Sequence, residues 1–192
     1  MNSSHLKAGS LVVRLIKPNV DRDAPFALGW FKSDHGNQTL LLMGNAENEI
    51  KPSTLYNEKK TLKKFIELEK SNEQITWMIQ TDNKTIGAVW IELKDDEFVK
   101  SPAVHMMIGD PKYRGKGIGK IIMSEMLKYI KEKLKSNIVY SRHLVNNKPV
   151  TALLDYFGFT NDGKSYIDIN NLEWQNVKLR SSCLITLCKN GY

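Results

Sequence analysis

The chain has 192 residues, of which 41% are hydrophobic and 26% are charged, an ordinary composition for a globular protein that gives no indication of disorder. The formal charge of +7 raises the question of nucleic acid, but the lysines of residues 59–70 and 128–135 are mixed with glutamates at helical spacing, which is typical of a solvated helix face. We therefore expect no nucleic-acid partner.

The length fits one domain with a sizeable core, and no break in composition divides it, so we expect a single domain over residues 1–192. No signal-peptide core opens the sequence, and no apolar run approaches the about 20 residues of a membrane span, which favours a cytoplasmic protein without membrane contact. Cys183 and Cys188 lie on opposite faces of a strand-like run, so neither a disulfide between them nor a metal or redox role is expected. Monomer and homodimer remain open.

The first half of the chain predicts a strand, a short helix, a long loop, a helix and three strands, over residues 10–17, 24–33, 32–57, 61–70, 75–81, 86–93 and 103–109. Asp21 or Asp23 can cap the short helix, whose first turn contains Pro25. The loop is rich in glycine and asparagine, and a loop of that length is usually functional or mobile. The last three strands are expected to form an antiparallel meander.

The second half predicts the principal helix over residues 117–135, a strand over 138–145 and a short helix over 147–157. A strand that begins at Gly158-Phe159 and a final strand over 181–189 follow. The polar segment 170–180 is left unassigned. The order of elements is therefore β-α-α-β-β-β-α-β-α-β-β.

The most informative stretch runs from residue 105 to residue 120, where an apolar strand and a Pro-containing turn precede a glycine-rich loop and the principal helix. Three glycines at alternate positions of loop 114–119 leave main-chain N–H groups uncovered, and the helix start adds unpaired N–H groups and a positive dipole end. Arg114, Lys116 and Lys120 add positive charge. This combination predicts a receptor for a bridging phosphate.

Two other phosphate-binding motifs do not fit this loop. A Walker A loop is excluded because Gly119-Lys120 follows Gly115 too closely and Ile121 has no hydroxyl group for magnesium. A dinucleotide fingerprint requires G-x-G-x-x-G after the first strand, whereas this loop reads G-x-G-x-G past the middle of the chain. An ordinary glycine-rich surface turn remains the alternative.

Arg114, Gly117 and Gly119 match in order the pattern Arg/Gln-x-x-Gly-x-Gly/Ala, so the loop resembles the acyl-CoA pyrophosphate loop of the GCN5-related N-acetyltransferases (GNAT). Asn147 followed by Gly158-Phe159 is similar to a second segment of that family, Asn-x-x-Ala…Tyr-x-x-x-Gly-Phe.

Two residues of this second segment depart from the family pattern. Val150 stands where alanine is usual, and Leu154 stands where the family often has a tyrosine that protonates the departing thiolate. The fold expectation is unaffected, but the general acid is left without an obvious residue.

The resemblance implies an α/β (α+β) fold with a mixed, mostly antiparallel sheet of six to seven strands and flanking helices. It also implies acetyl-CoA as the cofactor, and transfer of the acetyl group to a primary amine of a small molecule by direct attack on the thioester. A protein N-terminus or lysine as the acceptor, and a non-catalytic acyl-CoA-binding regulator suggested by Leu154, remain as alternatives.

The cofactor site that the resemblance implies lies at the end of the strand, along the glycine loop and at a later helix start: Met107, Ile108, Gly109, Arg114, Gly115, Lys116, Gly117, Ile118, Gly119, Lys120 and Asn147. In the family two neighbouring strands part, so that a main-chain N–H group, here of Ile108 or Gly109, is free to meet the thioester oxygen. Asn147 would hydrogen-bond the pantetheine arm, or only cap its helix.

The acceptor ammonium must lose a proton, for which Glu92 and His105 are the leading candidates, although the first can also be a solvated strand-end charge and the second a core histidine. Tyr156 is a candidate acid, but it lies two positions from the expected tyrosine, which turns it by roughly 200° around the helix. Tyr140 and a thiolate that leaves unaided are alternatives.

Trp30, Phe31 and the loop around Met43 are expected to line the acceptor pocket by analogy with the family. Packing of the first helix against the core is the alternative for these residues.

Overall fold

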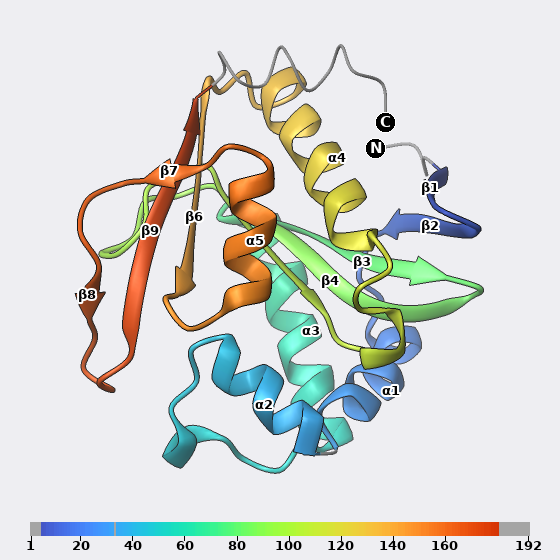
Figure 1. The fold of residues 1–192 in the computed structure, drawn as a ribbon. Helices are drawn as coiled ribbons and strands as arrows, with labels where there is room; N and C mark the ends of the chain where they lie inside the picture. The colour runs from blue at the N-terminus through green and yellow to red at the C-terminus, as the bar shows by residue number, and fades with distance from the viewer. Residues whose placement is uncertain (1–4, 33, 181–192) are drawn as a thin grey trace.

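The computed structural model describes residues 5–32 and 34–180 (Figure 1). Its elements are β1 (His5–Ala8), β2 (Leu11–Ile16), α1 (Val20–Phe31), α2 (Asp34–Leu42), η1 (Glu47–Glu49), α3 (Leu55–Lys70), β3 (Gln74–Thr81), β4 (Lys84–Glu92), β5 (Ala103–Ile108), η2 (Pro111–Tyr113), α4 (Ile118–Glu132), β6 (Ile138–Leu144), α5 (Lys148–Tyr156), β7 (Thr160–Asn161), β8 (Tyr166–Ile167) and β9 (Glu173–Arg180). The predicted strand 181–189, with Cys183 and Cys188, lies outside the described residues.

The described strands form one nine-stranded sheet in the order β1-β2-β3-β4-β5-β6-β9-β7, with β8 paired to β9. Every pairing is antiparallel except that of β5 with β6. The expected α/β (α+β) class, the mostly antiparallel sheet and the meander of β3, β4 and β5 are confirmed. The strand count exceeds the expected six to seven because β1, β8 and β9 were not predicted, whereas the strand expected to begin at Gly158-Phe159 is present as the two-residue strand β7.

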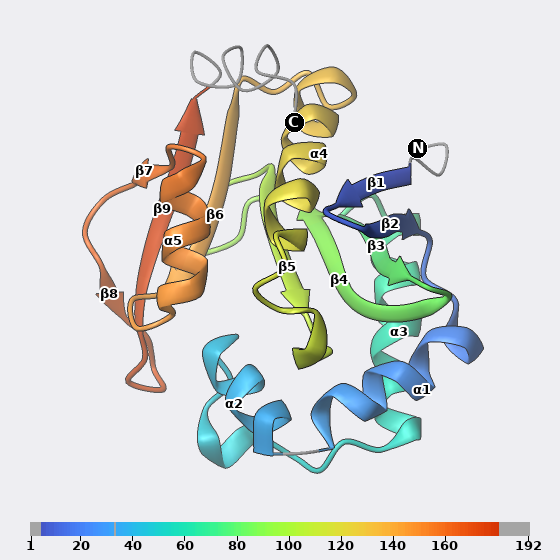
Figure 2. The ribbon, with the colours of Figure 1, turned by 45° about the vertical axis from the view of Figure 1, so that its right-hand side comes forward.

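Helices cover the two faces of the sheet unequally (Figures 1 and 2). The face that carries α4 and α5, here called the α4 face, holds the larger core, which includes Val104, Ile122, Met126 and Leu154. The opposite face carries α1 and α3 and is here called the α3 face; its smaller core joins Trp30, Leu62, Met78 and Ala88. No helix within the described residues has the length and apolar character that a membrane span requires.

Helix α1 begins at Val20, earlier than the predicted residue 24, and its cap is Asn19, whose side chain accepts from the Arg22 N–H at 2.9 Å. The expected caps Asp21 and Asp23 lie inside the helix instead. Asp23 is fully buried, and its carboxylate accepts from the Asn19 N–H and from the Thr85 hydroxyl of β4, both at 2.7 Å. This carboxylate therefore joins α1 to the sheet.

The loop expected over 32–57 contains helix α2 and the short helix η1, so that part of the prediction is wrong. Helix α2 has no apolar stripe and contains Gly36, which is why no helical periodicity marks residues 34–42. A Cβ atom at Gly36 would overlap the Phe31 backbone, so the glycine permits close packing against α1. Distant side chains also hold α2, since Arg114 donates to the Thr39 hydroxyl at 2.8 Å and Asn147 to the Leu42 carbonyl at 3.0 Å.

The segment 170–180, which was too polar to assign, contains β9, a full-length partner of β6. Its polar residues have low strand propensity, but pairing along β6 decides the structure. Trp174 and Asn176 face the same side of the sheet as Arg142, whereas Val177 and Leu179 enter the larger core on the α4 face. This strand adds residues to both faces beside β6.

Candidate functional site

Strands β5 and β6 part soon after they begin (Figure 2). Their only ladder pair is Ala103 with Tyr140, and next to it the Ser141 hydroxyl donates to the Val104 carbonyl at 2.8 Å. Because hydrogen-bonding direction alternates along a strand, the N–H groups of Met106 and Ile108 then point toward β6, where no pairing continues. Two main-chain donors therefore face the gap.

Of the two donors predicted for the thioester oxygen, only one faces this gap. The Gly109 N–H donates to the Ile86 carbonyl of β4 at 2.8 Å and is unavailable. Ile108 keeps the predicted orientation, and Met106 is a donor that the sequence analysis missed. Met107 is also misplaced for cofactor contact, because strand alternation turns its side chain to the α3 face beside Ala88.

The glycine loop leads from η2 into α4 without a side-chain cap. Gly115 and Gly117 have φ values of +71° and +78°, and a Cβ atom at either position would meet nothing within 4 Å. The N–H groups of Gly117, Ile118 and Gly119 donate to none of the described residues. The predicted set of bare amides at a helix start is thus present, beside the open space at Gly115 and Gly117.

The three cations of the loop differ in their surroundings. The Arg114 guanidinium donates to the carbonyls of Ile108 and Gly109, at 2.9 and 3.3 Å, as well as to α2, so it braces the loop against the end of β5. Burial is the main cause that lowers the pKa of Arg114, and Asp110 opposes the shift. The side chains of Lys116 and Lys120 instead lie over tyrosine rings at the surface. They are the cations beside the open amides.

Tyr156, the candidate acid, provides the ring over which the Lys120 ammonium lies, 3.6 Å from its centroid, and is 46% exposed. It does not line the cavity between β5 and β6, whereas Leu154 does. The two-residue offset along α5 accounts for this placement, which removes Tyr156 from the gap.

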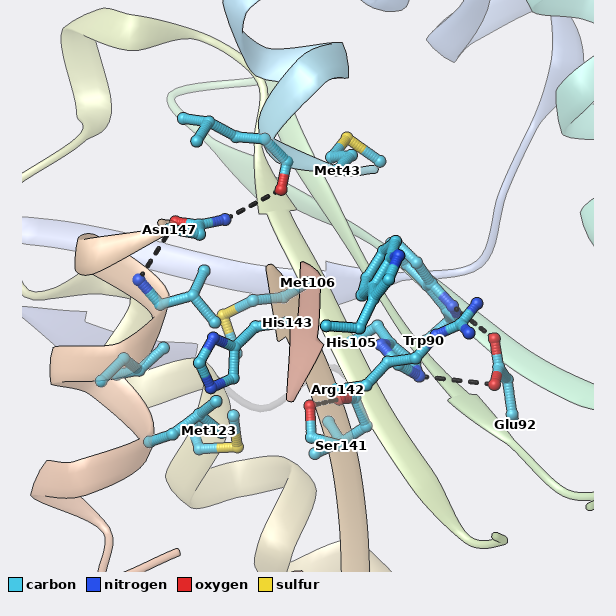
Figure 3. Close-up of a pocket in the computed structure, with 16 residues that line it drawn as sticks. Met43, Trp90, Glu92, His105, Met106, Met123, Ser141, Arg142, His143 and Asn147 are labelled. Carbon is cyan, nitrogen blue, oxygen red and sulfur yellow. Dashed lines mark hydrogen bonds and ion pairs between the residues drawn. The ribbon is translucent and has the colours of Figure 1, made fainter. Parts of the chain in front are cut away.

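A cavity with an empty volume of about 800 Å³, its open mouth included, occupies the gap and passes from one face of the sheet to the other (Figure 3). On the side of α5 it is lined by Val104, Met106, Met123, Ser141, His143, Asn147, Val150, Leu153 and Leu154. On the other side it is lined by Trp90, Glu92, His105, Arg142 and Trp174, with Leu42 and Met43 at the end of α2.

Glu92 and His105, the two predicted bases, meet at this cavity on the α3 face (Figure 3). His105 Nε2 lies 3.4 Å from Glu92 Oε2, an ion-pair distance without hydrogen-bond alignment, and the imidazole stacks on Trp90 with centroids 5.6 Å apart. Burial raises the pKa of Glu92, but the contact with His105, the Trp90 N–H and the charge of Arg142 outweigh it and leave this pKa below its ordinary value. Glu92 is therefore an ionised partner that faces the His105 imidazole.

Asn147 caps α5 by accepting from the Val150 N–H at 3.4 Å, and its amide also holds the end of α2. The capping role is therefore present in the structure. Its side chain lines the cavity as well, which keeps the predicted contact with the pantetheine arm open as a proposal.

The three residues predicted to line an acceptor pocket, Trp30, Phe31 and Met43, all line a second cavity of about 970 Å³ on the α3 face. It lies among α1, α3 and the segment after α2, and it shares Met43 and Trp90 with the first cavity. Glu58 lies on its wall, where burial raises the pKa of the carboxyl group against a 2.6 Å hydrogen bond from the Ser53 hydroxyl.

Arg142 and His143 are cavity residues that the sequence analysis missed. The guanidinium of Arg142 lies over the rings of Trp174 and Phe98, at 4.7 and 5.3 Å, and has a long contact of 3.5 Å with the Tyr166 hydroxyl. A strand over residues 138–145 was predicted, and the family resemblance implied that two neighbouring strands part. Together these two expectations indicated that polar residues of this strand border the gap.

Comparison with protein families finds that a model of the Acetyltransferase (GNAT) family matches residues 42–159, whereas comparison with curated proteins finds no match. Among solved structures, RimJ of Mycobacterium smegmatis in complex with CoA-disulfide has 15% identity and a TM-score of 0.75, over 98% of this chain and 94% of that one. The microcin C7 self immunity acetyltransferase MccE in complex with acetyl-CoA and AMP has 15% identity and a TM-score of 0.72, over 92% and 96%.

A third similar structure is spermidine N-acetyltransferase from Vibrio cholerae in complex with CoA and spermine. It has 17% identity and a TM-score of 0.66, over 91% of this chain and 98% of that one. At these identities the three structures establish the fold, and the family match extends over more than half of the chain.

Proposed function

The chain belongs to the Acetyltransferase (GNAT) family, and on that premise we propose that it transfers an acetyl group from acetyl-CoA to a primary amine of a small molecule. In this proposal the amine attacks the thioester carbonyl directly. The observation that carries it is the cavity through the sheet, which has the main-chain N–H group of Met106 at one wall and a carboxylate–imidazole pair at the other.

The residues of the α4 face fit coenzyme A by their donor chemistry. The bare N–H groups of residues 117–119, with Lys116 and Lys120, would hold the pyrophosphate. The N–H groups of Met106 and Ile108 would meet the carbonyl oxygen of the thioester, where they stabilise the negative charge that develops on it. The activated acetyl group is what the cofactor supplies when bound.

On the α3 face, His105 is the proposed base. An amine with a pKa near 10 is mostly protonated at neutral pH and must become neutral before it can attack. The ionised Glu92 carboxylate stabilises the imidazolium that forms when the ring takes up this proton. Stacking on Trp90 fixes the plane of the ring, so the pair is already oriented before an acceptor arrives.

The acceptor is proposed to lie in the second cavity and to reach the gap past Met43 and Trp90, which line both cavities. Walls formed by α1, α3 and the segment after α2 suit a small molecule. Arg142, the guanidinium beside Glu92, would contact a polar or anionic group of the acceptor.

A protein acceptor is the second candidate, because the second cavity opens beside exposed apolar side chains. Tyr56 is 76% exposed and Leu55 is 42% exposed at the start of α3, and Met43 at the end of α2 is 37% exposed. A rim of this kind can bind the residues that follow a peptide N-terminus.

The test is incubation of the protein with acetyl-CoA and a panel of monoamines, diamines, amino acids, amino-acid amides and short peptides, read by release of free thiol. We expect turnover with at least one small amine. Turnover confined to peptides would replace the small-molecule proposal by the second candidate. Absence of thiol release across the panel, with coenzyme A binding confirmed by calorimetry, would contradict catalysis and favour the regulatory alternative.

A further inference from the structure

The proposed transfer leaves the electron pair of the broken C–S bond on sulfur, and a proton donor at the sulfur would speed its departure. Leu154 occupies the position at which the family often has a tyrosine for this task, and it is 2% exposed and has no proton to give. An acid for the sulfur presupposes the proposed function, and the residues around Leu154 contain a candidate.

His143 lies on β6 with its side chain on the α4 face, where it lines the same wall of the cavity as Leu154 (Figure 3). Its neighbours along that wall are apolar or neutral, and His143 is the titratable residue among them. The hydroxyl of Ser141 is engaged with the Val104 carbonyl, and the amide of Asn147 with α2 and α5. Among the residues that line this wall, His143 is therefore the one that can give or take up a proton.

The hydrogen bonds of His143 decide which ring nitrogen faces the cavity. Nδ1 lies 2.9 Å from the Leu144 carbonyl, which can only accept, so Nδ1 carries a hydrogen. Thr151 lies 3.4 Å from Nδ1 and donates its own hydrogen to the Asn147 carbonyl, so it too is an acceptor for Nδ1. No hydrogen bond joins Nε2 to any described residue, and Nε2 is not sealed from the cavity.

We propose that His143 is the general acid that protonates the departing sulfur through Nε2. The amine nitrogen forms the new bond to the acetyl carbon, the C–S bond breaks with its electron pair on sulfur, and Nε2 of the imidazolium gives its proton to that sulfur. The nitrogen loses its extra proton to the base on the α3 face. The base passes to solvent first the proton of the ammonium and then this one, and solvent returns one proton to His143, so the overall reaction converts thioester and neutral amine into amide and thiol.

The charged groups that share the cavity with His143 all lie on the α3 face: Glu92, His105 and Arg142. On the α4 face, the polar groups within hydrogen-bond distance of the ring are the Leu144 carbonyl and the Thr151 hydroxyl, and both are acceptors for Nδ1. Acid and base are thus separated by the sheet, one on each side of the gap.

A histidine with only a structural role would use Nδ1 to hydrogen-bond the end of β6 and helix α5. Two substitutions separate this role from acid catalysis. His143→Asn keeps an N–H donor close to the position of Nδ1 and removes Nε2. His143→Gln places an amide near Nε2 that can hydrogen-bond but cannot donate a titratable proton. Binding of desulfo-coenzyme A, which has no sulfur to protonate, serves as the control for an intact site in both variants.

The first measurement needs no acceptor: the ultraviolet absorbance of the coenzyme A thiolate, recorded for the bound molecule at neutral pH. We expect more thiolate on the wild type than in free coenzyme A, because the imidazolium can form an ion pair with it, and a return to the free value in His143→Asn. Equal thiolate absorbance in the wild type and in His143→Asn would overturn the proposal.

The second measurement compares acetyl-CoA with its selenoester analogue, whose more acidic selenol leaves without a proton. With acetyl-CoA we expect both variants to lower kcat by about 100-fold or more, with little change in KM. With the selenoester the loss should fall to a few-fold. Equal losses with both donors would mean that His143 only positions the site. A wild type that is inactive toward every amine would contradict the proposed function instead, and the thiolate measurement would still decide the role of His143.

Discussion

The two faces of the sheet build their halves of the site differently. On the α4 face, the amides proposed for the cofactor come from one continuous stretch, the end of β5 and the loop into α4. On the α3 face, the cavity side chains come from α1, α2 and the segment after it, α3, β3, β4, β5, β6 and β9, which lie far apart in the sequence. Main-chain donors depend on local backbone geometry and tolerate changes of side chain, whereas the α3 face depends on the identity of each residue.

Among the substitutions that test this difference between the two faces, His105→Ala is expected to have the largest effect. Removal of the proposed base should lower kcat by about 1,000-fold, since positioned general bases contribute 10² to 10⁴ in rate. The KM for acetyl-CoA should stay within a few-fold, because the ring lies on the α3 face. Steady-state kinetics measure both. His35→Ala, on the exposed surface of α2, is the matched control and should behave as the wild type. A kcat loss below 10-fold would contradict the assignment.

The same contrast explains how much the sequence could predict. The Arg114–Gly119 motif, the positive φ values and the free amides are local properties, so they could be predicted from neighbouring residues. Glu92 and His105 could each be proposed as a base, but their contact could not be predicted, because it depends on the register of β4 with β5. Helix α2 could not be predicted, since distant side chains such as Arg114 and Asn147 hold it.

Other misses have the same cause. Strand β9 has polar residues with weak strand propensity, and only its pairing with β6 makes it a strand. Arg142 and His143 were inside a correctly predicted strand, yet their importance arises from the parting of β5 and β6, which no local pattern encodes. The Gly109 N–H was misassigned because its partner, Ile86, belongs to another strand.

On the α4 face, Gly117→Val should weaken coenzyme A binding by about 100-fold. A valine at φ +78° is strained by about 1–2 kcal/mol, and its side chain covers amides that would each lose a charge-assisted hydrogen bond. Calorimetry measures the affinity. Gly163→Val is the matched control, because that glycine also has positive φ, at +95°, and open space around it, but lies far along the chain in the segment before β8. Equal loss of affinity in both variants would assign the effect to folding.

Glu92→Gln tests whether the ionised carboxylate on the α3 face stabilises the folded protein. The folded state lowers the pKa of Glu92, so its ionised form stabilises the fold above the ordinary value of 4.5, and this contribution is lost as pH falls through the lowered value. We expect the variant to be destabilised by about 1–2 kcal/mol at pH 7, and the difference from the wild type to shrink as the pH falls below 4.5. Urea unfolding at the two pH values measures it, with the exposed Glu47→Gln as the control. A difference that does not change with pH would contradict the ion pair.

The smallest expected effect is that of Arg142→Lys. Lysine keeps the charge but loses the stacking on Trp174 and Phe98 that positions the guanidinium, and it loses the planar contact with the acceptor. We expect acceptor binding to weaken by about 1 kcal/mol, an about 5-fold rise in acceptor KM. The KM for acetyl-CoA should not change, because the guanidinium lies on the α3 face. Arg180→Lys, an exposed position at the end of β9, is the control. If amino acids lose more than their amides do, Arg142 contacts the carboxylate; equal KM values for wild type and variant would remove Arg142 from the acceptor site and leave it a structural link between β6 and β9.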